Sequence, residues 1–183
     1  MSPRILTVVT VYLTIAALIL TPDAALTSDQ VFIDTAQLKI LGGHAEDHLG
    51  ASTSGAGDVN GDGFPDIIAG APGSYNHSSN GGGTAYIILG SGSPTTELDL
   101  KFSHPGSVIV IHGAPEGSML GSSVSNAGDV NGDNIDDVII GAPGASSSDP
   151  DEDEAGRCYI IFGSANLPAM IDVSNLGSLG IEI

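Results

Sequence analysis

Residues 49–73 read LGASTSGAGDVNGDGFPDIIAGAPG and residues 120–144 read LGSSVSNAGDVNGDNIDDVIIGAPG, so the chain contains an internal repeat. The similarity continues downstream, where YIILGS begins at Tyr86 and YIIFGS begins at Tyr159. A repeat of this length indicates stacked supersecondary units, because each unit alone would leave an apolar face uncovered.

Each copy has the pattern of a series of short β-strands. Its apolar runs are rich in Ile and Val, and Gly, Pro, Asn or Asp bound them,. The runs are continuous rather than alternating, so both faces of the strands must be covered, as in small sheets stacked face to face. The predicted strands are 49–57, 66–71, 84–89 and 107–112 in the first copy, 120–128, 137–142, 157–162 and 179–183 in the second, and 37–42 as the outer strand of a preceding sheet.

The first 25 residues differ from the rest of the chain. Arg4 precedes an apolar run at residues 5–20, and small residues follow at Ala24 and Ala25. This order is typical of a secretory signal peptide, and the run is short for a membrane span. We expect residues 1–25 to be a signal peptide or an anchor that places the rest of the chain outside the cytosol, with a buried core helix as the alternative.

These patterns predict an all-β fold. We expect a partial β-propeller with two four-stranded antiparallel blades plus edge strands, after an N-terminal apolar leader helix. The propeller segment is expected at residues 26–183, with repeat 1 at about residues 43–112 and repeat 2 at about residues 113–183.

Composition narrows the classes of function. The chain has 22 Asp and Glu residues against 4 Lys and Arg, and its net charge of −18 excludes nucleic acid as an expected partner,. Its single cysteine, Cys158, rules out an internal disulfide framework,. Because Cys158 opens an apolar strand, we expect it to be a buried small side chain rather than a reactive thiol.

An acidic loop connects the first two predicted strands of each copy. Residues 58–66 and 129–137 both fit the pattern D-x-N-x-D-[GN]-x-x-D. Side-chain oxygens at positions 1, 3, 5 and 9, with a backbone carbonyl at position 7, can surround one Ca²⁺, which takes six to eight oxygen ligands. Position 6 needs a sharp turn, which Gly63 allows freely and Asn134 tolerates,.

Two alternatives compete with a calcium loop. An EF-hand begins in the same way, but it needs Glu at position 12 and flanking helices, whereas Ala69 and Ile140 stand at that position here,. The second alternative is an Asx-rich hairpin turn without a metal. Charge favours a cation, because carboxylates about 4 Å apart repel by roughly 4 kcal/mol per pair at an effective dielectric near 20.

The repeated motifs AGDVNGD and GAPG resemble the FG-GAP repeat family, known from the propeller of integrin α subunits and from many secreted proteins. The resemblance covers most of residues 38–183. It implies a ring of about seven repeats whose hairpin loops bind structural Ca²⁺, with two such sites in this chain. The ligands that it implies are Asp58, Asn60, Asp62, the Phe64 carbonyl and Asp66 in the first loop, and Asp129, Asn131, Asp133, the Ile135 carbonyl and Asp137 in the second.

The chain departs from the family pattern in two respects. Leu49 and Leu120 replace the Phe that precedes Gly, which is a mild change within an apolar position. Two copies and part of a third are too few to close such a ring. We therefore expect the sequence to be a fragment or a truncated gene product.

The resemblance and the leader together imply a secreted or cell-surface calcium-binding module for adhesion or protein interaction. We expect no enzymatic activity, because the sequence has no recognisable nucleophile-and-base set, phosphate-binding loop or dinucleotide fingerprint. The expected partner is an extracellular protein or glycan, bound by inter-blade loops at residues 73–83, 91–98 and 144–156. Asn76 begins an N-x-S sequon and is a candidate glycosylation site,.

Two other functions remain open. Such repeats also form the non-catalytic propeller of secreted hydrolases, for example a phospholipase. A minimal intact protein that oligomerises through open sheet edges is the third alternative.

Overall fold

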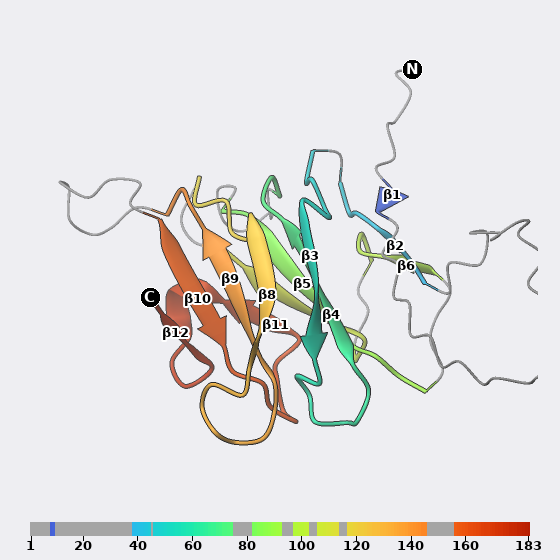
Figure 1. Cartoon of the computed structure of the whole chain (residues 1–183). Helices are drawn as coiled ribbons and strands as arrows, with labels where there is room; N and C mark the ends of the chain where they lie inside the picture. The colour runs from blue at the N-terminus through green and yellow to red at the C-terminus, as the bar shows by residue number, and fades with distance from the viewer. Residues whose placement is uncertain are drawn as a thin grey trace, which may run out of the picture.

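The computed structural model describes residues 8–9, 38–44, 46–74, 82–92, 97–102, 106–113, 117–145 and 156–183. These residues form three β-sheets and one short 3₁₀-helix, η1, at Val173–Asn175 (Figure 1). The all-β prediction is therefore confirmed for this part of the chain. The strands are β1 (Val8–Val9), β2 (Lys39–Leu41), β3 (Ser52–Gly57), β4 (Asp66–Ala71), β5 (Thr84–Ile88), β6 (Glu97–Asp99), β7 (Val108–His112), β8 (Ser123–Gly128), β9 (Asp137–Ala142), β10 (Arg157–Ile161), β11 (Met170–Asp172) and β12 (Gly180–Glu182).

Each copy of the repeat builds a sheet of four antiparallel strands. In the first copy the neighbours are β3, β4, β5 and β7, and in the second they are β8, β9, β10 and β12. The register also repeats, since Gly70 lies opposite Ser52 and Gly141 lies opposite Ser123. These two sheets are consistent with propeller blades, as the sequence predicted.

The first blade also has an edge strand that pairs in parallel. β11, from the second copy, pairs in parallel with β7 and makes the first sheet five-stranded, with Ile171 opposite Ile111. β6 pairs with β2 in the same parallel way, with Leu98 opposite Ile40. The segment after the third strand of each copy thus lies along the outer strand of the sheet before it. These two short strands, three residues each, were not predicted.

The main core lies between the two blades. Because side chains alternate along a strand, Ile68, Ile87 and Ile111 of the first blade and Ile140 and Ile161 of the second all enter one buried cluster.

The opposite face of the first blade carries a second cluster. Ala69, Ile88 and Val108 pack there against Ile40 of β2 and Leu98 of β6. Both faces of these strands are therefore covered, which accounts for their continuous apolar runs.

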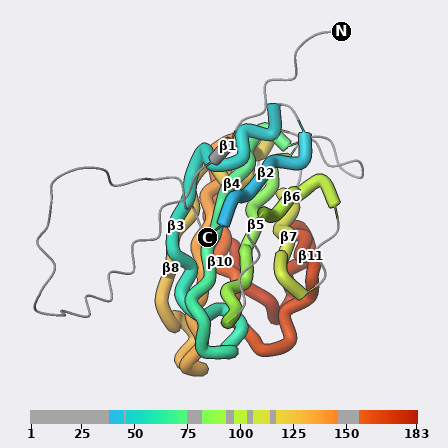
Figure 2. Tube along the Cα trace, turned by 90° about the vertical axis from the view of Figure 1, so that its right-hand side faces the viewer, coloured from blue at the N-terminus to red at the C-terminus, as the bar shows by residue number. Residues whose placement is uncertain are grey.

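The two blades approach most closely at their inner strands. β3 and β8 lie side by side along one edge of the molecule (Figure 2). The Ser52 hydroxyl donates a 2.7 Å hydrogen bond to the carbonyl oxygen of Gly121. A Cβ added to Gly70 would overlap that same oxygen, so this approach requires glycine at position 70.

The leader helix is not shown, since most of residues 1–25 lie outside the described residues. Val8 and Val9 are described, and they form a strand, β1, that pairs with Leu41 and Ile40. Within the described part of the chain, no helix is long and apolar enough to cross a lipid bilayer.

The expectation that Cys158 is buried is wrong. Its neighbour Tyr159 points into the main core, so Cys158 points to the opposite face of the second blade, where it is exposed,. The sequence pattern predicted the strand correctly, but its outer face is covered only in part, since Ile160 on that face is buried and Cys158 is not,.

Candidate metal-binding loops

The two acidic loops occupy equivalent places at the same end of their blades. Residues 58–65 connect β3 to β4, and residues 129–136 connect β8 to β9. A β-bulge precedes each loop, between Gly55 and Gly57 in the first copy and between Asn126 and Gly128 in the second. The bulge reorients the end of the inner strand, and each loop lies against the start of the next strand.

Asp58 organises the first loop through the backbone. Its two carboxylate oxygens accept hydrogen bonds from the amides of Asp62, at 3.0 Å, and of Gly63, at 2.8 Å. The Asp62 amide is shared with the side-chain oxygen of Asn60, at 3.0 Å, and the Asp62 carboxylate accepts from the Phe64 amide at 2.9 Å. The side-chain oxygens of positions 1, 3 and 5 are therefore held around one turn.

The second loop repeats this arrangement. Asp129 accepts hydrogen bonds from the amides of Asp133, at 3.0 Å, and of Asn134, at 2.8 Å. Asn131 accepts from the Asp133 amide at 2.9 Å, and Asp133 accepts from the Ile135 amide at 2.9 Å. The backbone amides around Asp129, first that of Asn134, lower the pKa of its carboxyl group, because they stabilise the charged form,.

Backbone conformation at position 6 explains the residue types found there. Gly63 has φ of 88° and Asn134 has φ of 69°, both in the left-handed region. Glycine enters this region without steric cost, and asparagine is one of the few other residues that tolerate it. The sharp turn predicted at this position is confirmed.

The last aspartate of each loop is buried, unlike the exposed Asp62 and Asp133. Asp66 is 2% exposed, and its two oxygens accept from the amides of Val59, at 2.8 Å, and Gly90, at 2.7 Å. Burial, with a smaller effect of the charges of Asp62 and Asp58, raises the pKa of the Asp66 carboxyl to about 6, although the hydrogen bonds from the two amides oppose this shift.

Asp137 repeats these contacts in the second copy. It accepts from the amides of Val130 and Gly163, both at 2.8 Å.

The oxygens of the first three candidate positions suit a hard cation in number and type. Carboxylate and amide oxygens are the donors that Ca²⁺ takes, and a carboxylate oxygen that accepts one N–H retains a second lone pair. Asp66 and Asp137 instead direct both oxygens toward backbone amides. Among the described residues, no group of three or more His, Cys, Asp and Glu side chains is arranged to hold a metal ion. The Asn oxygens and the carbonyls of Phe64 and Ile135 would therefore be needed to complete either donor set.

A contact between the two repeats involves the first loop, and the sequence analysis missed it. The amide of Asp58 donates to the carboxylate of Asp136 at 2.9 Å, and the amide of Asp136 donates to the carbonyl of Asp58 at 3.3 Å. The amide of Ser164 also donates to the Val59 carbonyl at 2.9 Å. The sequence feature that distinguishes Asp136 is the difference at position 8, where Pro65 stands in the first loop and Asp136 in the second.

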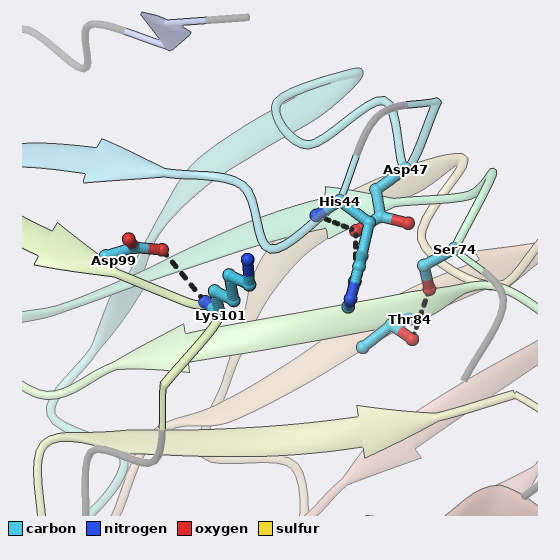
Figure 3. A network of polar contacts seen from close by, with 6 residues as sticks. All are labelled: His44, Asp47, Ser74, Thr84, Asp99 and Lys101. Atoms are coloured by element: carbon cyan, nitrogen blue, oxygen red, sulfur yellow. Dashed lines mark hydrogen bonds and ion pairs between the residues drawn. The ribbon is translucent and has the colours of Figure 1, made fainter. Parts of the chain in front are cut away.

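A second polar region lies away from these loops (Figure 3). Asp47 is buried and accepts from the amide of His44 at 2.9 Å, and burial raises the pKa of its carboxyl. The buried hydroxyls of Ser74 and Thr84 are hydrogen-bonded to each other. The first contact lies within one loop, and the second joins the segment after β4 to the first residue of β5.

Asn76 and much of the three predicted partner-binding segments lie outside the described residues. Glycosylation and partner binding at these positions therefore remain predictions.

Comparison with known proteins identifies the repeat. The FG-GAP repeat model matches residues 50–88 and 120–161. Integrin alpha-PS5 of Drosophila melanogaster is 36% identical over 105 residues, which are 54% of this chain and 9% of that protein. Human integrin alpha-6 is 31% identical over 109 residues, covering 60% of this chain and 8% of its own length. Human integrin alpha-7 is 33% identical over 108 residues, which are 59% of this chain and 8% of that protein.

The chain thus corresponds to less than a tenth of the length of these integrin alpha subunits. The matched residues include both acidic loops and the strands on either side of each loop. The chain therefore contains two FG-GAP repeats, at residues 50–88 and 120–161, and it is similar in part to integrin alpha subunits.

Proposed function

We propose that this chain is a secreted or cell-surface interaction module in which Ca²⁺ binds both acidic loops and stabilises the blades. The similarity to integrin alpha subunits supports an adhesion or protein-interaction role without catalysis. An extracellular protein or glycan is the proposed partner, bound by the loops between blades. The apolar leader supports export from the cytosol,.

One observation carries the calcium proposal. The hydrogen bonds that hold Asp58, Asn60 and Asp62 recur at the corresponding atoms of Asp129, Asn131 and Asp133. A turn stabilised only by its own Asx contacts does not need Asp at both positions 1 and 5, because Asn accepts the same hydrogen bonds. Their recurrence in two loops favours a shared ligand for the oxygens.

Charge supplies the driving force. Each loop has three carboxylates at positions 1, 5 and 9, and carboxylates about 4 Å apart repel by roughly 4 kcal/mol per pair at an effective dielectric near 20. A divalent cation would offset two of these three negative charges in each loop. Asp58, Asn60 and Asp62 would bind the ion in the first loop, and Asp66 would tie that loop to the strands. Extracellular calcium modules bind with Kd of about 10⁻⁴–10⁻³ M.

Thermal unfolding of the full chain tests the proposal. A ligand at 100 times its Kd stabilises the folded state by about 2.7 kcal/mol per site, which raises Tm by roughly 5–10 °C in a chain of this size. For a Kd of about 10⁻⁴ M, we expect about 10 mM CaCl₂, which is 100 times that Kd, to raise Tm by that amount and EDTA to reverse it. Asp62→Ala and Asp133→Ala should each remove part of the shift.

Glu182→Gln is the matched control, because it removes one charge from an exposed ion pair with Arg157. It should retain the full calcium shift. Equal Tm values in CaCl₂ and EDTA for the unmodified chain would reject a structural calcium ion.

A further inference from the structure

Asp136 joins the two loops directly. Its carboxylate accepts from the Asp58 amide at 2.9 Å, and its own amide donates to the Asp58 carbonyl at 3.3 Å. Asp58 is the first candidate ligand of the first loop, and Asp136 immediately precedes Asp137, the last candidate ligand of the second. Two hydrogen bonds therefore connect residues 78 positions apart that belong to different loops.

The structure provides a fitted space for the Asp136 carboxylate. A Cβ at Gly57 would overlap that carboxylate, and Gly57 has φ of 79°, so glycine both allows the turn and leaves room for the side chain. Pro65 occupies the corresponding position of the first loop and has no carboxylate. The contact is therefore particular to the junction between the first and second repeats.

The first loop is also held by the second repeat through Val59. Its carbonyl accepts from the Ser164 amide at 2.9 Å, and its side chain is 1% exposed within the main core. Val130 has the equivalent position in the second loop and is 50% exposed. The two loops match in sequence, yet Val59 is buried against the second repeat whereas Val130 is half exposed.

We infer that Asp136 couples the two loops, so that a divalent cation in the second loop strengthens cation binding in the first. This inference rests on the proposed function. A cation bound in the second loop would take the Ile135 carbonyl as a ligand and so restrict the peptide unit that Ile135 shares with Asp136, and Asp136 in turn holds Asp58 in place. A first ligand that orders shared residues lowers the entropy cost of binding the second. The coupling is reciprocal, because binding free energies are linked.

Titration of the full chain with CaCl₂, followed by NMR, measures each loop separately through the amides of Gly63 and Asn134. Asp133→Ala disables the second loop and should weaken calcium binding at Gly63 by about five-fold, the lower end of typical coupling. In an Asp136→Ala background, Asp133→Ala should change the calcium Kd measured at the Gly63 amide by less than two-fold. Asp136→Asn should preserve the coupling, because its amide oxygen can still accept from Asp58.

Hydrogen exchange gives a readout that does not depend on cation binding in the first loop. In an Asp62→Ala chain, calcium bound by the second loop should slow exchange of the Asp58 amide. Adding Asp136→Ala should abolish that slowing. Glu182→Gln, which removes a charge from the exposed ion pair with Arg157, should leave both measurements unchanged.

The outcomes separate this inference from the proposed function. Saturable calcium binding at both loops with independent affinities, or loss of coupling in Asp136→Asn as well as Asp136→Ala, would overturn the hydrogen-bonded coupling alone. Absence of saturable calcium binding in the unmodified chain would overturn both. Asp136→Asn keeps the test decisive if Asp136→Ala fails to fold.

Discussion

The carboxylate of Asp66 accepts a 2.8 Å hydrogen bond from the backbone amide of Val59, seven residues earlier in the chain. This bond connects the end of the first acidic loop to its beginning. The other oxygen of Asp66 accepts from Gly90 at 2.7 Å, beyond the third strand of the blade. One buried side chain thus joins three segments of the repeat, and Asp137 makes the same two contacts in the second copy.

We predict that Asp66→Ala destabilises the fold even without calcium. The substitution leaves the amides of Val59 and Gly90 without their acceptor, and each unsatisfied buried group costs roughly 1–3 kcal/mol. Urea denaturation in EDTA should show a loss of about 2 kcal/mol or more. Asp62→Ala, at an exposed position of the same loop, should cost about 1 kcal/mol or less,. Equal losses in the two variants would contradict a structural role for the buried carboxylate.

The close approach of the two blades gives a second prediction. Gly70→Ala should destabilise the chain by at least about 2 kcal/mol, in the range typical of overpacking, because the new Cβ would overlap the Gly121 carbonyl oxygen and the Ser52 hydroxyl. Gly55→Ala is the matched control in the neighbouring strand, where nothing lies within 4 Å of the added Cβ. Denaturant midpoints that coincide for the two variants would show that the blades do not meet as closely at Gly70.

The sequence predicted the antiparallel strands well, because short Ile- and Val-rich runs bounded by Gly and Asp favour β-strands over other secondary structure. β4 and β9 match their predicted ranges, 66–71 and 137–142, and the other antiparallel strands of the two blades lie within theirs. Which faces of the strands are buried was predictable only in part. Continuous apolar runs required two buried faces, which the first blade has, but the same pattern in β10 led to a wrong prediction for Cys158.

The features that sequence reasoning missed depend on contacts between repeats. β6 and β11 are three residues long, and their parallel pairing with β2 and β7 is set by register with strands of the preceding sheet. The contact between Asp58 and Asp136 likewise joins distant residues. Local patterns contain no information about which partner such short segments will meet.

The third prediction concerns the turn at Gly63. Its φ of 88° suits glycine, and no atom lies within 4 Å of an added Cβ, so any cost of substitution comes from the backbone. Gly63→Val should destabilise the chain by about 1–2 kcal/mol, the cost of the left-handed conformation. Gly63→Asn should cost much less, because Asn134 adopts the same conformation in the second loop. Urea denaturation of both variants in EDTA checks this order, and a Val variant as stable as the Asn variant would contradict it.

The fourth prediction is that His112 makes the folded state less stable in mild acid. Burial lowers the pKa of His112 below 6.5, although the Asp172 carboxylate opposes this shift. The unfolded chain therefore takes up a proton near pH 6.5 while the folded chain keeps His112 neutral. The stability due to the neutral imidazole is fully present above pH 6.5 and is lost as the pH falls through the folded-state pKa.

His112→Gln removes this titration and leaves the acidic residues in place. Burial raises the pKa values of Asp66 and Asp47, so these groups favour the folded state on acidification, but they contribute to both chains alike. We expect the difference in unfolding free energy between the unmodified chain and the variant to shift against the unmodified chain between pH 7.5 and pH 5. Urea titrations at the two pH values measure this difference. A constant difference would show that His112 has the same pKa in the folded and unfolded chains.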